Sequence, residues 1–109
     1  MAHHDAARVM ALVAHMTGEL PELLVGRGRG TASAARARQL AMYLLRVVCR
    51  LQFAEIGSLF GRDASTVVHA CARVEDRRDN PQFEAMVSRM EEALEVPSAE
   101  FEERRHAQG

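Results

Sequence analysis

Apolar residues recur at helical spacing along most of the chain, and no stretch alternates with the period of two that a half-buried strand shows. Asp5 is placed to cap a first helix, and Gly18 is placed to end it. The pattern therefore predicts an all-α fold. The apolar stripe of this first helix, spaced i, i+3, i+4, i+7, consists of Val9, Leu12, Val13 and Met16.

Three further helices are predicted in the middle of the chain. A short helical turn begins near Pro21, and a long helix covers roughly residues 34–49. Between them, the stretch GRGRGTASAA has no periodicity and predicts a surface loop. The stretch QFAEIGSLFG indicates a short helix that Gly61 closes. The positions expected to face inward are Leu40, Leu44, Val47, Leu51, Phe53, Ile56, Leu59 and Phe60.

Two more helices follow. One begins near Ala64 and runs to about Arg78, and the last begins at Pro81 with Asn80 as its cap. The short helix, tight turn and longer helix over residues 52–78 have the spacing of a helix-turn-helix. In these two helices, inward-facing positions are expected at Val67, Val68, Cys71, Val74, Phe83, Met86, Val87, Met90 and Leu94.

The composition fits a single small globular domain, because 109 residues with 48% apolar content suffice for one core. We expect this domain over residues 1–97, followed by a charged, frayed tail over 98–109. No apolar run is long enough to span a bilayer, and the N-terminus lacks a signal-peptide pattern. Cys49 and Cys71 have no CxxC spacing, which favours a reduced cytoplasmic setting.

Charge is distributed unevenly although the net charge is only −1. Residues 26–50 contain six arginines and no acid, whereas residues 79–109 contain eight acids and three arginines. A basic segment of this kind outweighs net charge when partners are inferred, because a partner meets the local field. The basic segment indicates an anionic partner.

The start of the helix near residue 64 carries candidate base-contacting groups. The second helix of a helix-turn-helix lies in the major groove and presents its N-terminal residues to base edges. Here these residues are Asp63, Ala64, Ser65 and Thr66, preceded by Arg62. Asp63 is also a good N-cap, and the two roles are compatible because its second oxygen can still accept from a base.

Arginines in the basic segment point to phosphate contacts. Arg36 and Arg38 are expected in the first turns of a helix, where the macrodipole disfavours cations. A DNA phosphate that meets both the arginines and free backbone N–H groups would remove this conflict. Arg27 and Arg29 alternate with glycines and would form a cationic arm for a minor groove or a phosphate backbone, or else a solvated basic loop.

Three segments together carry a family resemblance. ARARQLAMYL, EIGSLFGRD and STVVHACARVE resemble the C-terminal DNA-binding domain of the bacterial replication initiator DnaA, in order and nearly in spacing. The similarity covers roughly residues 6–95. It implies an all-helical fold whose helix-turn-helix recognises short duplex sites, the DnaA boxes.

The resemblance assigns roles position by position. Arg38 and Gln39 match the family's Arg-Gln pair at the start of the long helix, where phosphates are contacted. Arg27 or Arg29 corresponds to the basic-loop arginine that probes the minor groove, and differing loop lengths leave the choice open. The segment that enters the major groove corresponds here to Arg62, Asp63, Ser65 and Thr66.

The chain also departs from the family pattern. The family has two glycines before Arg-Asp, whereas this chain has only Gly61. Its histidine after the aspartate is Ala64 here, and one of its two threonines is Ser65. Each lost base contact costs about 1–3 kcal/mol of discrimination. An alanine can instead touch a thymine methyl, so altered specificity is as consistent with these changes as weakened specificity.

Features of an enzyme are not found in the sequence. There is no nucleophile–base constellation, and the five histidines are scattered without metal-ligand spacing. GRGRGT lacks the Gly-Lys-Ser/Thr ending of a phosphate loop, so we expect no ATPase. His69 and Cys71 do not share a helical face. We therefore expect no cofactor, metal or small-molecule substrate.

Two functions follow as alternatives. The first is a stand-alone, cytoplasmic, nucleoid-associated protein that binds double-stranded DNA at DnaA-box-like sites and regulates replication initiation or transcription. The second is a degenerate copy of the domain that binds a replication or proteolysis factor through its acidic C-terminal helix and tail. Specific binding to a duplex separates the two.

Overall fold

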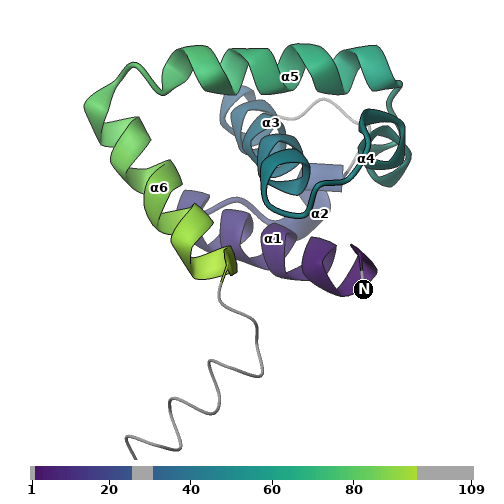
Figure 1. Ribbon diagram of the computed structural model, residues 1–109, viewed down its shortest axis with the longest axis horizontal. Coiled ribbons are helices and arrows are strands. Elements are labelled where there is room, and N and C mark those ends of the chain that lie inside the picture. Colours follow the sequence, from purple (N-terminus) through teal and green to yellow (C-terminus); the bar gives the residue numbers. More distant parts are fainter. Residues whose placement is uncertain (1, 26–30, 96–109) are drawn as a thin grey trace, which may run out of the picture.

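The computed structural model describes residues 2–25 and 31–95, with side chains from Ala6 onward in the first segment. These residues form helices and no strands (Figure 1), so the predicted all-α class is confirmed. The helices are α1 (Ala2–Thr17), α2 (Pro21–Val25), α3 (Ala32–Val47), α4 (Phe53–Phe60), α5 (Ala64–Arg77) and α6 (Pro81–Glu95).

Two predicted helix starts differ from the structure. α1 begins at Ala2, so Asp5 lies within the helix and the predicted cap at Asp5 is wrong. α3 begins at Ala32, two residues before the expected start, because Thr31 supplies a cap that the sequence reading overlooked. The Thr31 hydroxyl accepts from the backbone N–H of Ala34 at 3.0 Å, and the alanine-rich segment that follows has high helix propensity.

Other helix ends have recognisable capping signals, and those predicted at Gly61 and Asn80 are confirmed. Gln52 and Glu55 form a capping box at the start of α4, and Gly61 ends that helix with a φ of 66°. A left-handed φ of this kind favours glycine, so one glycine suffices for this turn. Asn80 caps α6, since its Oδ1 accepts from the N–H groups of Gln82 and Phe83 at 2.9 and 3.1 Å.

α3 is the central element of the fold. It packs against α1, α2, α4 and α5, while α5 crosses one side of the molecule and α1 lies on the opposite side (Figure 1). α3 buries residues on most of its circumference, as expected for a helix with neighbours on several sides. The largest fully buried side chains of the core are Phe60, Leu24, Leu40, Met42, Leu44, Leu45, Ile56 and Met90.

Four apolar residues that were expected inside are exposed. Val68 is 43% exposed although its neighbour Val67 is fully buried. Consecutive residues on a helix are separated by about 100°, so a helix packed on one side cannot bury both. The other three, Met16, Val47 and Leu59, are each 40–41% exposed.

A polar network joins the C-terminal end of α5 to α6 and α3. Arg78 donates from Nη1 to Glu91 Oε2 at 3.0 Å and to the hydroxyl of Tyr43 at 2.9 Å, and from Nη2 to Glu84 Oε2 at 3.0 Å. Ser88 donates to Glu84 at 2.7 Å. This network holds α6 at its angle to α5, because a bonded arginine fork restricts both partners.

Two predicted segments fall outside the described residues. Residues 26–30 of the predicted loop and the tail over 98–109 belong to the parts of the chain that are not described. The loop prediction is wrong for residues 32–35, which form the start of α3. Within residues 2–25 and 31–95, no helix is both long and apolar enough to cross a membrane.

Candidate nucleic-acid interface

The turn between α4 and α5 depends on a close backbone approach. A Cβ atom added at Gly57 would clash with the carbonyl oxygen of Arg62. The backbone N–H of Arg62 also donates to the Gly57 carbonyl at 2.8 Å. Only glycine leaves room for this contact, so Gly57 sets the distance between the two helices of the helix-turn-helix.

The N-terminal end of α5 is organised around Asp63. Its Oδ1 accepts from the backbone N–H of Thr66 at 3.2 Å, from the Thr66 hydroxyl at 2.7 Å and from the Ser65 hydroxyl at 3.2 Å. These bonds, with that of the Thr66 hydroxyl first, hold the pKa of Asp63 below its usual value. The predicted N-cap is thus confirmed, and all three side chains are exposed to solvent.

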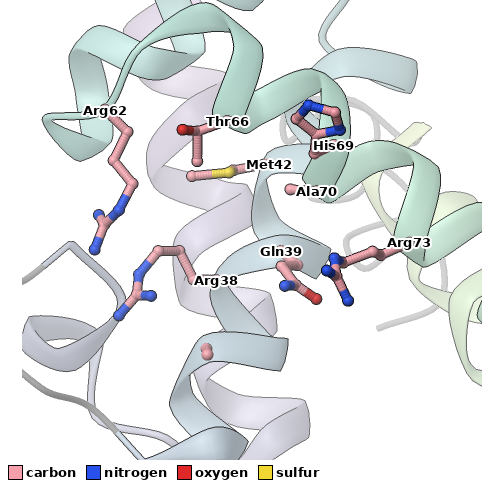
Figure 2. Close-up of a pocket in the computed structure, with 9 residues that line it drawn as sticks. Arg38, Gln39, Met42, Arg62, Thr66, His69, Ala70 and Arg73 are labelled. Carbon is pink, nitrogen blue, oxygen red and sulfur yellow. The ribbon is translucent and has the colours of Figure 1, made fainter.

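A groove lies between the N-terminal half of α3 and the first turns of α5, with a volume of about 320 Å³. Figure 2 shows the Arg62 side chain extending from the turn toward Arg38, and Arg73 extending from α5 toward Gln39. We call this the α3–α5 groove. Its lining residues, none of which is acidic, are Ala35, Arg38, Gln39, Met42, Arg62, Thr66, His69, Ala70 and Arg73.

Arg38 has a structural contact that the sequence did not indicate. Its Nε donates to the carbonyl of Leu24 at 2.9 Å and its Nη2 donates to that of Leu23 at 3.2 Å, so it caps the C-terminal end of α2. Burial, and then the charge of Arg62, lower the pKa of Arg38. The Arg38 guanidinium therefore holds α2 by hydrogen bonds and at the same time lies near the positive charge of Arg62.

The predicted conflict between the α3 macrodipole and its arginines is smaller than expected. Because α3 begins at Ala32, Arg36 is the fifth residue of the helix and Arg38 the seventh. The dipole effect fades beyond the first turn. The expected conflict between these arginines and the helix dipole is therefore weak, and the other arginines near them provide the stronger repulsion.

The predicted residues fall into two described groups. Arg38, Gln39, Arg62 and Thr66 meet in the α3–α5 groove. Asp63 and Ser65 lie beside it at the exposed start of α5. The Nη1 of Arg62 donates to the Phe60 carbonyl at 2.9 Å, which orients its guanidinium over the groove.

Arg27 and Arg29 belong to the segment outside the described residues. Their predicted place in a minor groove therefore stays a prediction.

The groove also contains two residues that the sequence reading did not assign to the interface. His69 and Arg73 follow Thr66 at i+3 and i+7, and both are exposed. Residues at these spacings share a helix face with Thr66, so the helical period alone was a usable signal. His69 is among the lining residues of the groove and is labelled beside Ala70 in Figure 2.

The groove can bind an anion. Three arginines line it without a carboxylate, and guanidinium groups match phosphate geometry through paired N–H donors. Converging cations repel one another, and an oxyanion between them lowers that repulsion. The exposed groups of Asp63, Ser65 and Thr66 next to the groove add further hydrogen-bonding atoms to this surface.

Comparison with known proteins gives a consistent family match. The family model described as the bacterial DnaA protein helix-turn-helix matches residues 6–74, from α1 through most of α5. The chromosomal replication initiator protein DnaA of Deinococcus radiodurans is 35% identical over 95 residues, which are 86% of this chain. The DnaA proteins of Mycobacteroides abscessus and Thermus thermophilus are 44% identical over 70 residues and 42% identical over 73 residues.

These relatives are much longer than the matched region. The match spans 20% of the Deinococcus protein, 14% of the Mycobacteroides protein and 16% of the Thermus protein. The matches to the Mycobacteroides and Thermus proteins cover 64% and 66% of this chain. The similarity therefore concerns the helix-turn-helix region of these proteins.

Proposed function

The chain belongs to the family of bacterial DnaA helix-turn-helix domains, and on this premise we propose that it binds double-stranded DNA at DnaA-box-like sites. It would act as an accessory regulator of replication initiation or transcription in the bacterial cytoplasm. The observation that supports this most is the acid-free α3–α5 groove, which places three arginines beside the exposed start of α5. Such a surface suits a phosphate backbone next to a major groove.

Each group has a distinct task in this proposal. Arg38 and Gln39 on α3, with Arg73 on α5, contact backbone phosphates on the same side of the groove. The start of α5 enters the major groove and reads base edges. A loop arginine, Arg27 or Arg29, probes the adjacent minor groove. The base-contacting residues are Arg62, Asp63, Ser65 and Thr66.

The hydrogen bonds at the start of α5 favour particular bases. The hydroxyls of Ser65 and Thr66 both donate to Asp63, so their lone pairs are left to accept. With the carboxylate, they present acceptors that match the amino groups of cytosine and adenine. Arg62 supplies donors that match guanine. A preferred site should combine a guanine with a neighbouring cytosine or adenine.

Binding titrations test the proposal. The protein is titrated against a duplex with the family's usual box, a scrambled duplex and a randomised pool from which sites are selected. With about four to six phosphates neutralised, log K should fall against log salt with a slope of about −4 to −5. Absence of binding to every duplex at low salt would overturn the proposal.

Matched variants separate backbone contacts from base contacts. Arg38→Gln should weaken binding to all sequences alike, whereas Arg89→Gln on α6, outside the groove, should leave binding unchanged. Because Arg38 also caps α2, its variant needs a parallel unfolding measurement. Equal binding of Arg38→Gln and wild type would remove the phosphate role of this residue.

A protein-interaction function is the second candidate. Seven large apolar side chains are exposed among the described residues, and Met16, Leu20, Leu23 and Val25 lie close together in the chain at the α1–α2 corner. Exposed apolar groups of this kind favour a protein contact. If no duplex is bound, substitution of Leu20 and Leu23 by serine would test this surface against candidate replication factors.

A further inference from the structure

A second hollow continues the α3–α5 groove toward the C-terminal end of α5. It shares Ala35, Gln39 and Arg73 with the groove and adds Arg36 from α3 and Arg77 from α5. Arg73 therefore lies at the junction of the two hollows. The arginines along this side of α5 therefore continue beyond the helix-turn-helix residues, with Asp76 as the acid among them.

Arg77 has donor capacity that the protein does not use. Its guanidinium lies over the Phe83 ring, 4.1 Å from the ring centre, and its Nη1 is buried without a hydrogen-bond partner among the described residues. An unsatisfied buried donor is costly, and few are kept without a reason. Burial, followed by the charge of Arg36, lowers the pKa of Arg77.

Nearby acids do not neutralise this pair. Asp76 lines the second hollow, and Asp79 lies with Arg77 in a depression on the α6 side. Neither aspartate is within ion-pair distance of a described arginine. Both ion pairs found in residues 6–25 and 31–95 are formed by Arg78 with glutamates. The second hollow thus contains three arginines, Arg36, Arg73 and Arg77, and one unpaired aspartate.

The outer ends of the two adjoining hollows, at Arg62 and at Arg77, are too far apart to share one phosphate. From Thr66 to Arg77, α5 rises by about 16 Å at 1.5 Å per residue. Base pairs of a duplex are about 3.4 Å apart along the axis. An anion at Arg77 must therefore be a different group from one held at Arg38 and Arg62, and a DNA strand offers such a series of phosphates.

We propose that Arg36 and Arg77 form a second backbone-phosphate site, which holds the DNA strand beyond the segment bound in the α3–α5 groove. The inference rests on the proposed function, since it adds a contact to the same DNA. Arg36 is exposed and can meet a phosphate directly, and Arg77 supplies N–H groups from across the hollow. The protein then covers more base pairs than its helix-turn-helix alone requires.

Duplex length provides the test. Binding is measured on duplexes that contain the same preferred site and are extended by increasing numbers of base pairs on either side. Wild type should gain affinity, and salt dependence, when one flank is lengthened. Arg36→Gln and Arg77→Met should each lose roughly three- to tenfold of this gain and lower the salt slope by about one, while binding to the shortest duplex is unchanged.

Controls separate this site from general charge and folding. Arg89→Gln removes one exposed arginine from α6 and should keep the full gain from the flank. Arg77→Met keeps an apolar side chain beside Phe83 but loses the guanidinium that lies over the ring, so its unfolding is measured in parallel. Arg36→Gln alters an exposed side chain and should unfold like wild type. Wild-type behaviour of both on long duplexes would overturn this inference.

Other outcomes are also decisive. If no duplex is bound, the proposed function itself fails, whereas binding without an effect of flank length contradicts only the second site. Inorganic phosphate is titrated as a further probe. If it raises the melting temperature through Arg36 and Arg77 while the DNA flank has no effect, the site binds a free anion and the assignment to DNA is overturned.

Discussion

Arg78, which follows the C-terminal end of α5, and the arginines near its N-terminal end have opposite surroundings. At the C-terminal end, Arg78 is bonded to Glu84, Glu91 and Tyr43. Toward the N-terminal end, Arg38 and Arg62 converge in a groove that no carboxylate lines. The pKa of Arg78 is raised by Glu84 and then Glu91, whereas that of Arg38 is lowered by burial and then by Arg62.

This contrast separates two uses of one residue type. An arginine that is saturated by acids stabilises the fold and has little left for a ligand. An arginine that faces other cations costs the free protein some stability and is available to an anion. The number of arginines in a segment therefore says less about DNA binding than the carboxylates around each one.

The largest loss of stability is expected at the turn between α4 and α5, which positions the N-terminal end of α5. Gly57→Ala should destabilise the protein by about 3 kcal/mol, because the added methyl meets the Arg62 backbone, which cannot move like a flexible side chain. Urea unfolding measures the loss. Ser58→Ala, at an exposed position of the same helix, should change stability little. A Gly57→Ala protein as stable as wild type would contradict the close approach.

Removal of the Arg78 side chain should destabilise the contact between the C-terminal end of α5 and α6. This side chain is 20% exposed and forms ion pairs with two glutamates. Arg78→Ala should lower the free energy of unfolding by about 2 kcal/mol. A fully buried ion pair would cost more, but the Glu84 side chain is 44% exposed. Thermal unfolding should show a Tm lower by roughly 8–16 °C. Arg73→Ala, without an ion pair, should leave Tm near wild type and weaken DNA binding instead. An equal loss of Tm in both variants would contradict the assignment of a structural role to Arg78 and a DNA-binding role to Arg73.

Low pH should weaken the interaction between Arg78 and Glu84 in a defined pH range. Bonds from Arg78, and then from Ser88, lower the pKa of Glu84 from 4.5 to about 2. A carboxyl whose pKa is depressed in the folded state stabilises it above the unfolded pKa and loses this effect as pH falls toward the folded value. The stability difference between wild type and Glu84→Gln should therefore persist above pH 4.5 and vanish toward pH 2. A difference independent of pH would contradict this role of Glu84.

The smallest effect on stability is expected at Asp63, where capping and base reading coincide. Asp63→Ala removes the acceptor for the Thr66 N–H and should lower Tm by a few degrees. Asp63→Asn keeps a capping oxygen and should retain the wild-type Tm. Both should change the ranking of duplex sequences, because the carboxylate is lost in each. An unchanged ranking with Asp63→Asn would leave capping as the only role.

Much of the fold could be read along the chain because its signals are local. The caps at Asp63 and Asn80 and the end at Gly61 act within a few residues, so spacing in the sequence was sufficient to find them. The prediction that the start of α5 reads bases rests on the same local spacing, and it stays a prediction. The errors were also local, since Thr31 was overlooked as a cap and Val68 was placed on the buried face.

The side-chain partners were beyond such reasoning. The helical period gives the direction of each residue around its own helix, but not which neighbouring helix faces it. The bonds of Arg38 to α2, the bond of Arg78 to Glu91 and the proximity of Arg36 to Arg77 each join residues more than ten positions apart. Helix order and candidate contacts thus follow from the order of residues. Which arginines are saturated and which stay open to an anion depends on how the helices pack.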